Sequence, residues 1–412
     1  MPASRPAPFD VAVTGLGLIT PAGIGIEQNW QRILSGVSTA RPGPELGGAG
    51  SGISCQIEGF DADQVLGREL SWRLDRFVQL ALAASRAALA DAGLDPGSWD
   101  GARVGVVMGN SLGGSATFEK QHQRLLAGGP RRVSPMLIPM SMMNMVSGYV
   151  AMDCGAGGPN LVTASACASG ASAIGTGRAM LRAGECDIVI AGASESALSG
   201  AVLSGLGALG ALSARTDDPG AASRPFDAER DGFVPGEAAG VLILERTGDA
   251  RARGARIRAK ISGYAATADA YHATAPDPSG AGVERAIRQA LQDAGVSAQE
   301  VTHVNAHGTS TPLNDLVEGQ VLHRVFGTGP AVTSTKGVTG HTLGAAGAIE
   351  AAYAVLAVEN DEIPPTANLD TIDPEIAIDV VTGGSRKEKV EVATTNSFGF
   401  GGHNAVLVVT AA

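Results

Sequence analysis

Short runs rich in valine and isoleucine alternate with longer alanine-rich stretches along most of the chain. The short runs favour strands, because β-branched side chains fit a pleated surface, and the alanine-rich stretches favour helices. This alternation predicts an α/β fold in which helices pack on sheets. The predicted strands span residues 11–14, 103–108, 187–191, 241–245, 257–263, 301–306, 331–334 and 405–410.

Two predicted helices, residues 77–92 and 283–294, carry apolar side chains three and four positions apart. Both run into the same tripeptide, Asp-Ala-Gly, whose glycine is typical of a helix end. A second echo joins residues 161–170 to residues 331–340, since each segment reads as a strand, a turn and the start of a helix. These repeats predict an internal duplication in which both turns lie beside a shared central cleft.

The duplication divides the chain into two similar α/β halves, residues 1–255 and 256–412. A hydrophobic content of 44% is enough for a large core, and 57 glycines with only 4% aromatic residues imply close approaches between backbones. The net charge of -11 disfavours nonspecific nucleic-acid binding, which needs a basic surface.

The sequence shows no sign of export or of a membrane span. Its first residues contain no apolar run of the kind that a signal peptide needs, so we expect a cytoplasmic protein. Apolar stretches at 133–152 and 197–214 are interrupted by proline or diluted by glycine and serine, which favours buried helices and loops. Four cysteines without C-x-x-C spacing predict neither a zinc ribbon nor a disulfide framework.

One of the cysteines stands out by its surroundings. Cys167 lies in a Ser-Ala-Cys-Ala-Ser-Gly turn that should open a helix, where free backbone amides and the helix dipole favour a thiolate. We therefore predict that Cys167 is a nucleophile with a lowered pKa. The other three, Cys55, Cys154 and Cys186, have no such context and are interpreted as buried small side chains.

His307 follows a predicted strand and precedes Gly-Thr-Ser-Thr-Pro, so it lies where a strand ends in a loop. Such strand ends are where α/β folds place catalytic groups. A zinc site shared by His303 and His307 would need a helix to bring them together and further ligands, whereas the local sequence favours a strand. We therefore predict a catalytic role for His307 rather than metal binding.

A second candidate histidine, His341, belongs to a glycine-rich turn that leads into a helix. A helix start favours a neutral imidazole, which can donate a hydrogen bond to a carbonyl oxygen. Lys336 and Glu350 lie in the same segment, and we predict that they form an ion pair that fixes this turn.

Three further patterns are weaker. Residues 396–404 hold many glycines around Phe400, which indicates exposed amides near a ligand and an apolar gate. The sequence Gly-Asn-Ser-Leu-Gly around Ser111 matches the nucleophile elbow of α/β-hydrolases, so a hydrolase is an alternative. The start of a dinucleotide-binding loop at Gly15 lacks the third glycine and the later acidic residue, which argues against a dinucleotide site.

In combination, the motifs resemble one family, the beta-ketoacyl-[acyl carrier protein] synthases, closest to the synthase II type. The resemblance covers nearly the whole chain and implies a thiolase-like fold, with two similar α/β halves layered as a sandwich of helices and sheets. It rests on residues 11–21, 224–233, 271–278, 305–315 and 396–404.

The resemblance also implies roles for matching positions. Catalytic roles fall to Cys167, His307, His341, Lys336, Glu350 and Phe400, and substrate binding to Thr309, Thr311, Phe398, Leu112 and Leu137. The backbone amides of Cys167 and Phe400 would form an oxyanion hole. A methionine-rich segment at 136–145 departs from the family pattern and is apolar enough to predict burial in a dimer.

The implied activity is that of a 3-oxoacyl-[acyl carrier protein] synthase, which joins malonyl-carrier protein to an enzyme-bound acyl thioester by a decarboxylative Claisen condensation. The resemblance implies fatty acid or type II polyketide elongation and no cofactor beyond the carrier's phosphopantetheine. An iterative polyketide ketosynthase, for example for polyene chains, paired with a chain-length partner subunit is the alternative. A non-catalytic chain-length subunit is disfavoured by the retained Cys167, His307 and His341.

Two kinds of partner follow from the same resemblance. One is an acyl carrier protein, and the other is a second chain, either identical in a homodimer or a related ketosynthase-like chain in a heterodimer. Because carrier proteins of this family's systems are acidic, we expect them to dock on a local basic patch. The candidate residues are Arg68, Arg73, Arg76, Arg131 and Arg132.

Overall fold

The computed structural model describes residues 9–43 and 52–412. The strands are β1 (Val11–Thr20), β2 (Gly23–Ile24), β3 (Arg41–Pro42), β4 (Ile53–Ser54), β5 (Val104–Gly109), β6 (Asn160–Thr163), β7 (Ile188–Glu195), β8 (Ala238–Arg246), β9 (Ala259–Ala268), β10 (His303–Asn305), β11 (Ala331–Thr333), β12 (Glu362–Ile363), β13 (Asp379–Val380), β14 (Arg386–Lys387), β15 (Val392–Gly399) and β16 (His403–Thr410).

Helices connect most of these strands. They are α1 (Ile26–Ser35), α2 (Ala62–Leu66), α3 (Arg68–Ser71), α4 (Arg76–Asp91), α5 (Ser115–Gly128), α6 (Leu137–Ser141), α7 (Met145–Cys154), α8 (Ser169–Ala183), α9 (Gly200–Ala208), α10 (Thr247–Ala252), α11 (Ala281–Ala294), α12 (Pro312–Phe326), α13 (Lys336–Thr339) and α14 (Ala346–Asn360). No helix in the described ranges combines the length and the hydrophobicity that crossing a bilayer requires.

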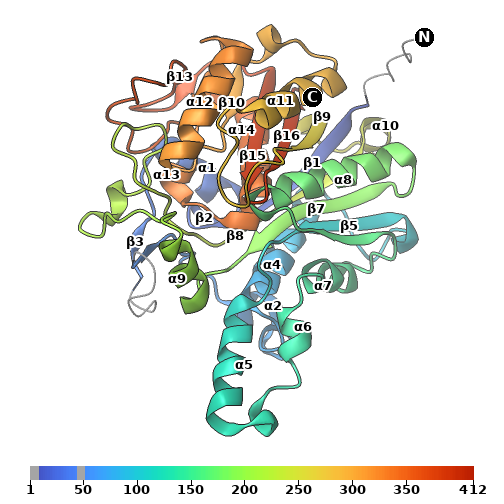
Figure 1. Ribbon diagram of the computed structural model, residues 1–412. Helices are drawn as coiled ribbons and strands as arrows, with labels where there is room; N and C mark the ends of the chain where they lie inside the picture. The colour runs from blue at the N-terminus through green and yellow to red at the C-terminus, as the bar shows by residue number, and fades with distance from the viewer. Residues whose placement is uncertain (1–8, 44–51) are drawn as a thin grey trace.

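The main sheet has 12 strands, in the order β13-β11-β10-β15-β16-β9-β1-β8-β7-β5-β6 with β2 beside β1 (Figure 1). Read outward from the β1–β9 contact, the two sides repeat one connectivity: β1, β8, β7, β5 and β6 correspond to β9, β16, β15, β10 and β11. The pairing directions also match, because the strands nearest the contact pair antiparallel and the outer ones parallel. This repetition confirms the predicted internal duplication.

Local contacts repeat as well. A Cβ added to Gly15 would lie 2.2 Å from the Ala88 carbonyl oxygen, and one added to Gly263 would lie 2.3 Å from that of Ala290, so each first strand needs glycine where its outer helix crosses. The two Asp-Ala-Gly tripeptides end α4 and α11 as predicted, and each aspartate accepts a backbone N–H from the strand beneath its helix.

Helices cover both faces of the main sheet, as the layered prediction requires. Helices α4 and α7 pack on the outer side of the first half, and α11 packs on the outer side of the second. Helices α8 and α14 lie between the halves, where Gly170 and Gly347 let the two backbones cross closely. The apolar side chains of α14 are buried over its whole length up to Val358, so the core runs through the centre of the molecule.

All eight predicted strands overlap observed strands, but six strands of only two residues each were missed, and so was β15. Its interior residues Thr394, Thr395, Asn396 and Ser397 are polar and yet fully buried. A run of polar residues reads as a loop because the hydrophobic pattern that marks a strand is absent. Only the neighbouring strands β10 and β16 reveal why this segment is extended.

Candidate active site

Cys167 lies in a single 3₁₀ turn, Ala166–Ala168, directly before the central helix α8. The residue before it, Ala166, has a φ of 50°, a conformation that is uncommon without glycine and that the surrounding fold must hold in place. The Cys167 Sγ atom is buried and lies 3.1 Å from Nε2 of His341, which is 174 residues away in sequence. The predicted nucleophile thus lies within hydrogen-bond distance of an imidazole nitrogen.

The predicted lowering of the Cys167 pKa is wrong. The pKa of this thiol is raised to about 12, chiefly by burial and to a smaller extent by the charge of Glu195. The Lys336 ammonium and the Phe400 backbone N–H act in the opposite direction but do not outweigh the loss of hydration. The resting group is therefore a neutral thiol, which can donate a hydrogen bond to His341 Nε2.

His307 comes two residues after β10, at the strand end where it was predicted. Its backbone N–H donates to Glu318 Oε1 at 2.8 Å, and the Lys336 ammonium lies 3.4 Å from its Nδ1 atom. Because an ammonium only donates, Nδ1 accepts and the ring proton is on Nε2. Burial first, and then the charges of Lys336 and His341, hold the pKa of His307 well below its usual value, so the ring is neutral.

Lys336 and Glu350 form the predicted ion pair, and both are about 1% exposed. The Lys336 ammonium also donates to the His307 carbonyl oxygen at 2.6 Å. Burial raises the pKa of Glu350, and the Lys336 charge opposes that shift. The pair therefore places a compensated positive charge directly behind the His307 ring.

His341 is clamped by its backbone between Val234 and Gly236: its N–H donates to the first carbonyl at 2.7 Å, and its carbonyl accepts from the second N–H at 3.0 Å. The Phe233 ring meets the imidazole edge-on at 5.0 Å. Burial and the Lys336 charge lower the pKa of His341 well below its usual value. Within the described residues its Nδ1 atom has no hydrogen-bond partner, so only the contact of Nε2 with the Cys167 thiol bears on which nitrogen carries the proton.

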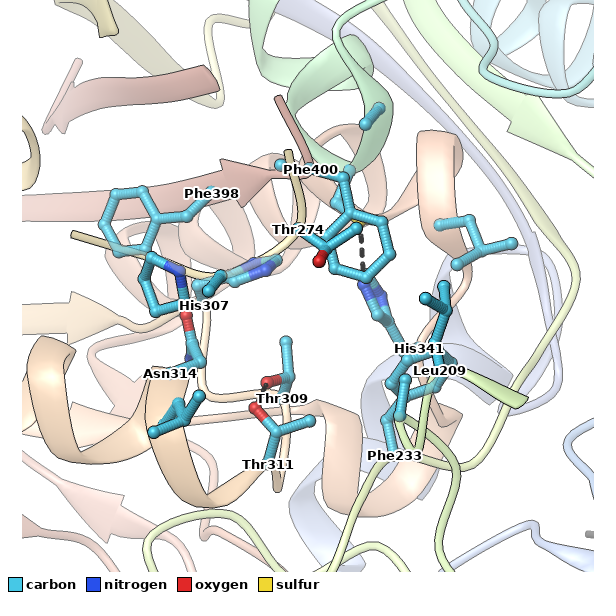
Figure 2. A pocket seen from close by; sticks show the side chains of 18 of the residues that line it. Leu209, Phe233, Thr274, His307, Thr309, Thr311, Asn314, His341, Phe398 and Phe400 are labelled. Atoms are coloured by element: carbon cyan, nitrogen blue, oxygen red, sulfur yellow. Dashed lines mark hydrogen bonds between the residues drawn. The ribbon is translucent and has the colours of Figure 1, made fainter. Parts of the chain in front are cut away.

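These groups open into a cavity of about 780 Å³. Figure 2 shows the rings of His307 and His341 facing this space, with Thr309 and Thr311 on its wall. The two threonine hydroxyls lie 2.9 Å apart. The lining includes the predicted residues Cys167, His307, His341, Thr309, Thr311, Phe398, Phe400 and Leu112.

Leu137 does not join them. It is half-buried on α6, which packs on α5 and α7, and it is not part of the cavity wall formed by the described residues. Phe398 packs edge-on against His307 with the ring centres 5.6 Å apart, and Phe400 is 38% exposed at the cavity surface. The gating role of Phe400 stays a prediction.

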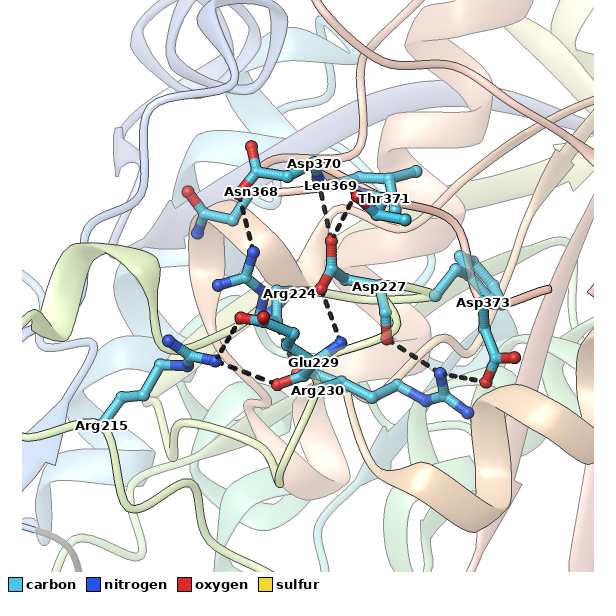
Figure 3. A network of polar contacts seen from close by, with 12 residues as sticks. Arg215, Arg224, Asp227, Glu229, Arg230, Asn368, Leu369, Asp370, Thr371 and Asp373 are labelled. Carbon is cyan, nitrogen blue, oxygen red and sulfur yellow. Dashed lines mark hydrogen bonds and ion pairs between the residues drawn. The ribbon is translucent and has the colours of Figure 1, made fainter.

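Figure 3 shows an ionic network around the buried side chains of Arg224, Asp227 and Arg230, and two of its arginines also hold the turn that carries Thr309 and Thr311. Arg230 donates to the Thr311 carbonyl oxygen at 3.3 Å and pairs with Asp373 at 2.7 Å. The Arg224 N–H donates to the Ser310 hydroxyl oxygen at 2.9 Å. Ser310 has a positive φ of 68°, so these contacts stabilise a backbone shape that the residue would not choose alone.

Two carboxylates beside the site escaped the sequence analysis. Glu318 accepts the backbone N–H groups of His307 and Gly308 at 2.8 and 2.7 Å, and Glu195 accepts that of Ser111 at 2.8 Å. Both glutamates are buried. Neither belongs to a pattern that points to chemistry, because their importance comes from turns that fold against them.

The hydroxyl of Ser111 donates to Glu195 and not to a histidine, which does not support the hydrolase alternative. His303, the other half of the rejected zinc pair, turns its ring toward the Ala331 carbonyl oxygen at 3.0 Å. Within the described ranges, one group of three potential metal ligands was found, formed by Cys167, His307 and His341. Their ligand atoms lie within 4.8 Å of one another. A metal ion would therefore have to displace the thiol proton of Cys167, the predicted nucleophile.

Family models match both halves of the chain. Residues 9–250 match the model described as "Beta-ketoacyl synthase, N-terminal domain", and residues 258–370 match "Beta-ketoacyl synthase, C-terminal domain". A curated relative, the 3-oxoacyl-[acyl-carrier-protein] synthase 2 of Synechocystis sp., is 46% identical over 404 residues, which cover 96% of this chain and 97% of the relative.

Solved structures show the same fold. The ishigamide ketosynthase/chain length factor superposes with a TM-score of 0.92 at 33% identity, covering 98% of this chain and 100% of that one. A ketosynthase bound to the hexaketide, in complex with its type II PKS acyl-carrier protein, superposes with a TM-score of 0.90 at 34% identity, covering the same shares of the two chains.

Proposed function

Because the chain belongs to the beta-ketoacyl synthase family and is a condensing acyltransferase, a 3-oxoacyl-[acyl carrier protein] synthase, we propose that Cys167 accepts its acyl group and that His307 and His341 serve decarboxylation and condensation. The observation that carries the assignment is the meeting of these three side chains at the wall of one cavity. The Cys167 thiol and the two neutral imidazoles offer the nucleophile, the base and the hydrogen-bond donor that the reaction needs.

Acyl transfer begins with the neutral thiol. As the Cys167 sulfur attacks the thioester carbonyl, its proton moves to His341 Nε2, 3.1 Å away. The backbone amides of Cys167 and Phe400 stabilise the oxyanion of the tetrahedral intermediate. When that intermediate collapses, His341 returns the proton to the departing carrier thiolate, so the products are an acyl-enzyme, a free carrier thiol and a neutral imidazole.

Condensation uses the donor side of the same rings. His307, whose Nε2 proton is fixed by Lys336 at Nδ1, donates to the thioester carbonyl oxygen of malonyl-carrier protein, and His341 donates beside it. Loss of carbon dioxide leaves an enolate, which these hydrogen bonds stabilise. The enolate carbon attacks the acyl thioester, the Cys167 thiolate leaves, and a proton from solvent restores the thiol. We expect no metal or redox cofactor, since every step moves only protons, acyl groups and carbon dioxide.

Both fatty acid elongation and type II polyketide elongation use this reaction, and we propose that the protein acts in one of these two pathways. The relative named 3-oxoacyl-[acyl-carrier-protein] synthase 2 favours the first, and the similarity to an ishigamide ketosynthase/chain length factor favours a polyketide or polyene ketosynthase with a partner subunit. A purely structural chain-length role is disfavoured by the complete set of Cys167, His307 and His341.

An acyl carrier protein is the proposed partner, supported by the similar ketosynthase that was solved with its carrier. Of the predicted docking arginines, Arg76 is engaged in an ion pair with Glu237, whereas Arg131 and Arg132 are exposed beyond the end of α5. A homodimer or a heterodimer with a related chain remains our proposal. It is supported by exposed apolar side chains on and beside the methionine-rich segment, including Ile138, which is 61% exposed.

The test of the nucleophile is intact-protein mass spectrometry with a panel of acyl-carrier proteins. We expect Cys167→Ala to abolish acylation, because no other cysteine lines the cavity formed by the described residues. Cys186→Ala is the matched control, since Cys186 is also fully buried, near the far end of α8, and should leave the acyl adduct intact. A stable adduct that persists in Cys167→Ala would disprove the assignment.

A further inference from the structure

Glu195 is a buried carboxylate without a cation. Of the four other buried glutamates, Glu237, Glu245 and Glu350 each pair with a cation, and Glu318 is held by neutral donors as Glu195 is. Glu195 ends β7 and is 0% exposed, and across residues 9–43 and 52–412 no lysine, arginine or histidine lies within ion-pair distance of it. An uncompensated buried carboxylate is costly, so neutral donors must hold it.

The donors come from two turns that are far apart in sequence. In the first turn, the backbone N–H of Ser111 donates to Oε2 at 2.8 Å, the Ser111 hydroxyl donates to the same oxygen, and Asn110 Nδ2 donates to Oε1 at 3.1 Å. Backbone N–H groups of Leu112 and of Gly344, in the second turn, also face the carboxylate. Burial raises the pKa of Glu195 to about 7, and these donors act against that shift.

Both turns line the cavity that holds Cys167. Ser111 and Leu112 contribute from the first turn and Leu343 from the second. Leu343 has a φ of 50°, which is uncommon for a residue other than glycine. The contact is also tight, because a Cβ added to Gly344 would lie 2.7 Å from Glu195 Oε2 and 2.9 Å from the Ser111 nitrogen. The glutamate therefore fills the space between the turns and links them.

We propose that Glu195 is a positioning residue that joins these two turns into one wall and thereby sets which acyl chains the cavity accepts. The inference rests on the proposed function, since it concerns the acyl group delivered to Cys167. A shift of the wall by a fraction of an ångström changes the space for a chain, because packed side chains leave few voids. Glu195 acts through Ser111, Leu112 and Leu343 and touches no substrate itself.

Glu195→Gln is the sharpest variant. Its amide group has nearly the same shape, but the NH₂ end must face either the Ser111 donors or the Asn110 donor, which pushes the first turn away. We expect the ratio of kcat/KM for dodecanoyl over butanoyl pantetheine thioester to change by about fivefold or more. Acylation of Cys167 is followed in single turnovers by intact-protein mass spectrometry.

Two further variants serve as a control and as a second test of the same contact. Glu245→Gln is the matched control, because Glu245 is a buried carboxylate at the end of β8 that pairs with Arg253, away from the cavity lining. It should lower stability and leave the chain-length ratio unchanged. Ser111→Ala should shift the ratio in the same direction as Glu195→Gln but less, and the double variant should fall short of the product of the two effects, because both residues act on one contact.

An unchanged ratio in both Glu195→Gln and Ser111→Ala, or an equal shift in Glu245→Gln, overturns the proposal. If Glu195→Gln does not fold, Ser111→Ala alone decides, since it removes one hydroxyl and leaves the carboxylate in place. Failure of the proposed function looks different, because the unaltered enzyme would then show no acyl adduct on Cys167 with either thioester.

Discussion

The turn Ala166–Ala168, which opens α8 and carries Cys167, has a counterpart in the turn Leu343–Ala345, which opens α14 just after His341. Both are single 3₁₀ turns, and both begin at a residue with a φ of 50°. The structure therefore matches Cys167 with Gly344, whereas the predicted echo of residues 161–170 in residues 331–340 would have matched it with Gly337. The same backbone turn thus occurs twice, once around Cys167, the proposed nucleophile, and once around Gly344, which has no side chain.

The strand ends beside the two turns are what differ. A Cβ added to Gly399, the last residue of β15, would lie 2.5 Å from the Ser165 carbonyl oxygen and 3.0 Å from the Cys167 nitrogen, so the bare strand backbone packs directly against the turn that carries Cys167. The matching last residue of β7 is Glu195, whose carboxylate lies against the Gly344 turn. A duplicated fold can thus keep one copy of a site open while an internal carboxylate fills the other.

The largest expected effect, on both stability and condensation, comes from removing the positive charge of Lys336. Lys336→Met leaves Glu350 buried without its cation, so we expect the free energy of unfolding to fall by about 3–5 kcal/mol. Condensation should be lost as well, because nothing would fix the His307 proton on Nε2. Urea unfolding measures the first effect, and product formation from malonyl-carrier protein measures the second.

The double variant Lys336→Met with Glu350→Gln sharpens the result. It removes both charges, so it should recover most of the stability without recovering condensation. Recovery of both would show that the pair has only a structural role and that His307 needs no fixed tautomer.

Glu195, which lies against the turn Leu343–Ala345, should make the stability of the protein depend on pH. The pKa of Glu195 is raised from 4.5 to about 7, so between those values the native protein holds a proton that the unfolded chain has released. The stabilisation that this bound proton gives is fully present below the pKa of Glu195 in the unfolded chain. It is lost as the pH rises through the pKa in the folded protein, so the free energy of unfolding should fall by about 3 kcal/mol. Glu195→Gln should remove this part of the slope. Parallel pH profiles of unfolding for the variant and the parent would contradict the assignment.

The smallest of the three expected effects distinguishes the turn Ala166–Ala168, which carries Cys167, from the turn Leu343–Ala345, which Glu195 contacts. Gly399→Ala pushes a methyl group toward the Ser165 carbonyl and the Cys167 amide, so we expect acylation to slow by about a hundredfold through the displaced oxyanion donor. Gly344→Ala pushes on Glu195 instead and should alter chain-length preference more than the acylation rate. Equal loss of rate in both variants would mean that the two turns are not functionally distinct.

Much of the fold could be predicted from local patterns. Valine-rich runs marked most strands, and the repeated Asp-Ala-Gly marked the ends of α4 and α11, because periodicity and helix-end chemistry act over a few residues. The motifs around Cys167, His307 and His341 likewise singled out three side chains that line one cavity. The strand β15 was missed, since burial of polar residues is decided by neighbouring strands.

By itself, therefore, the sequence determined which side chains can react and which segments become helices and strands. Tertiary structure alone decided the protonation state of Cys167, because its pKa depends on how completely the fold removes water from the thiol. It also decided the role of Glu195, whose hydrogen-bond partner Ser111 lies 84 residues away and whose contact at Gly344 lies in the other half of the chain. Desolvation and long-range contacts belong to the packed molecule, and no local pattern of residues encodes them.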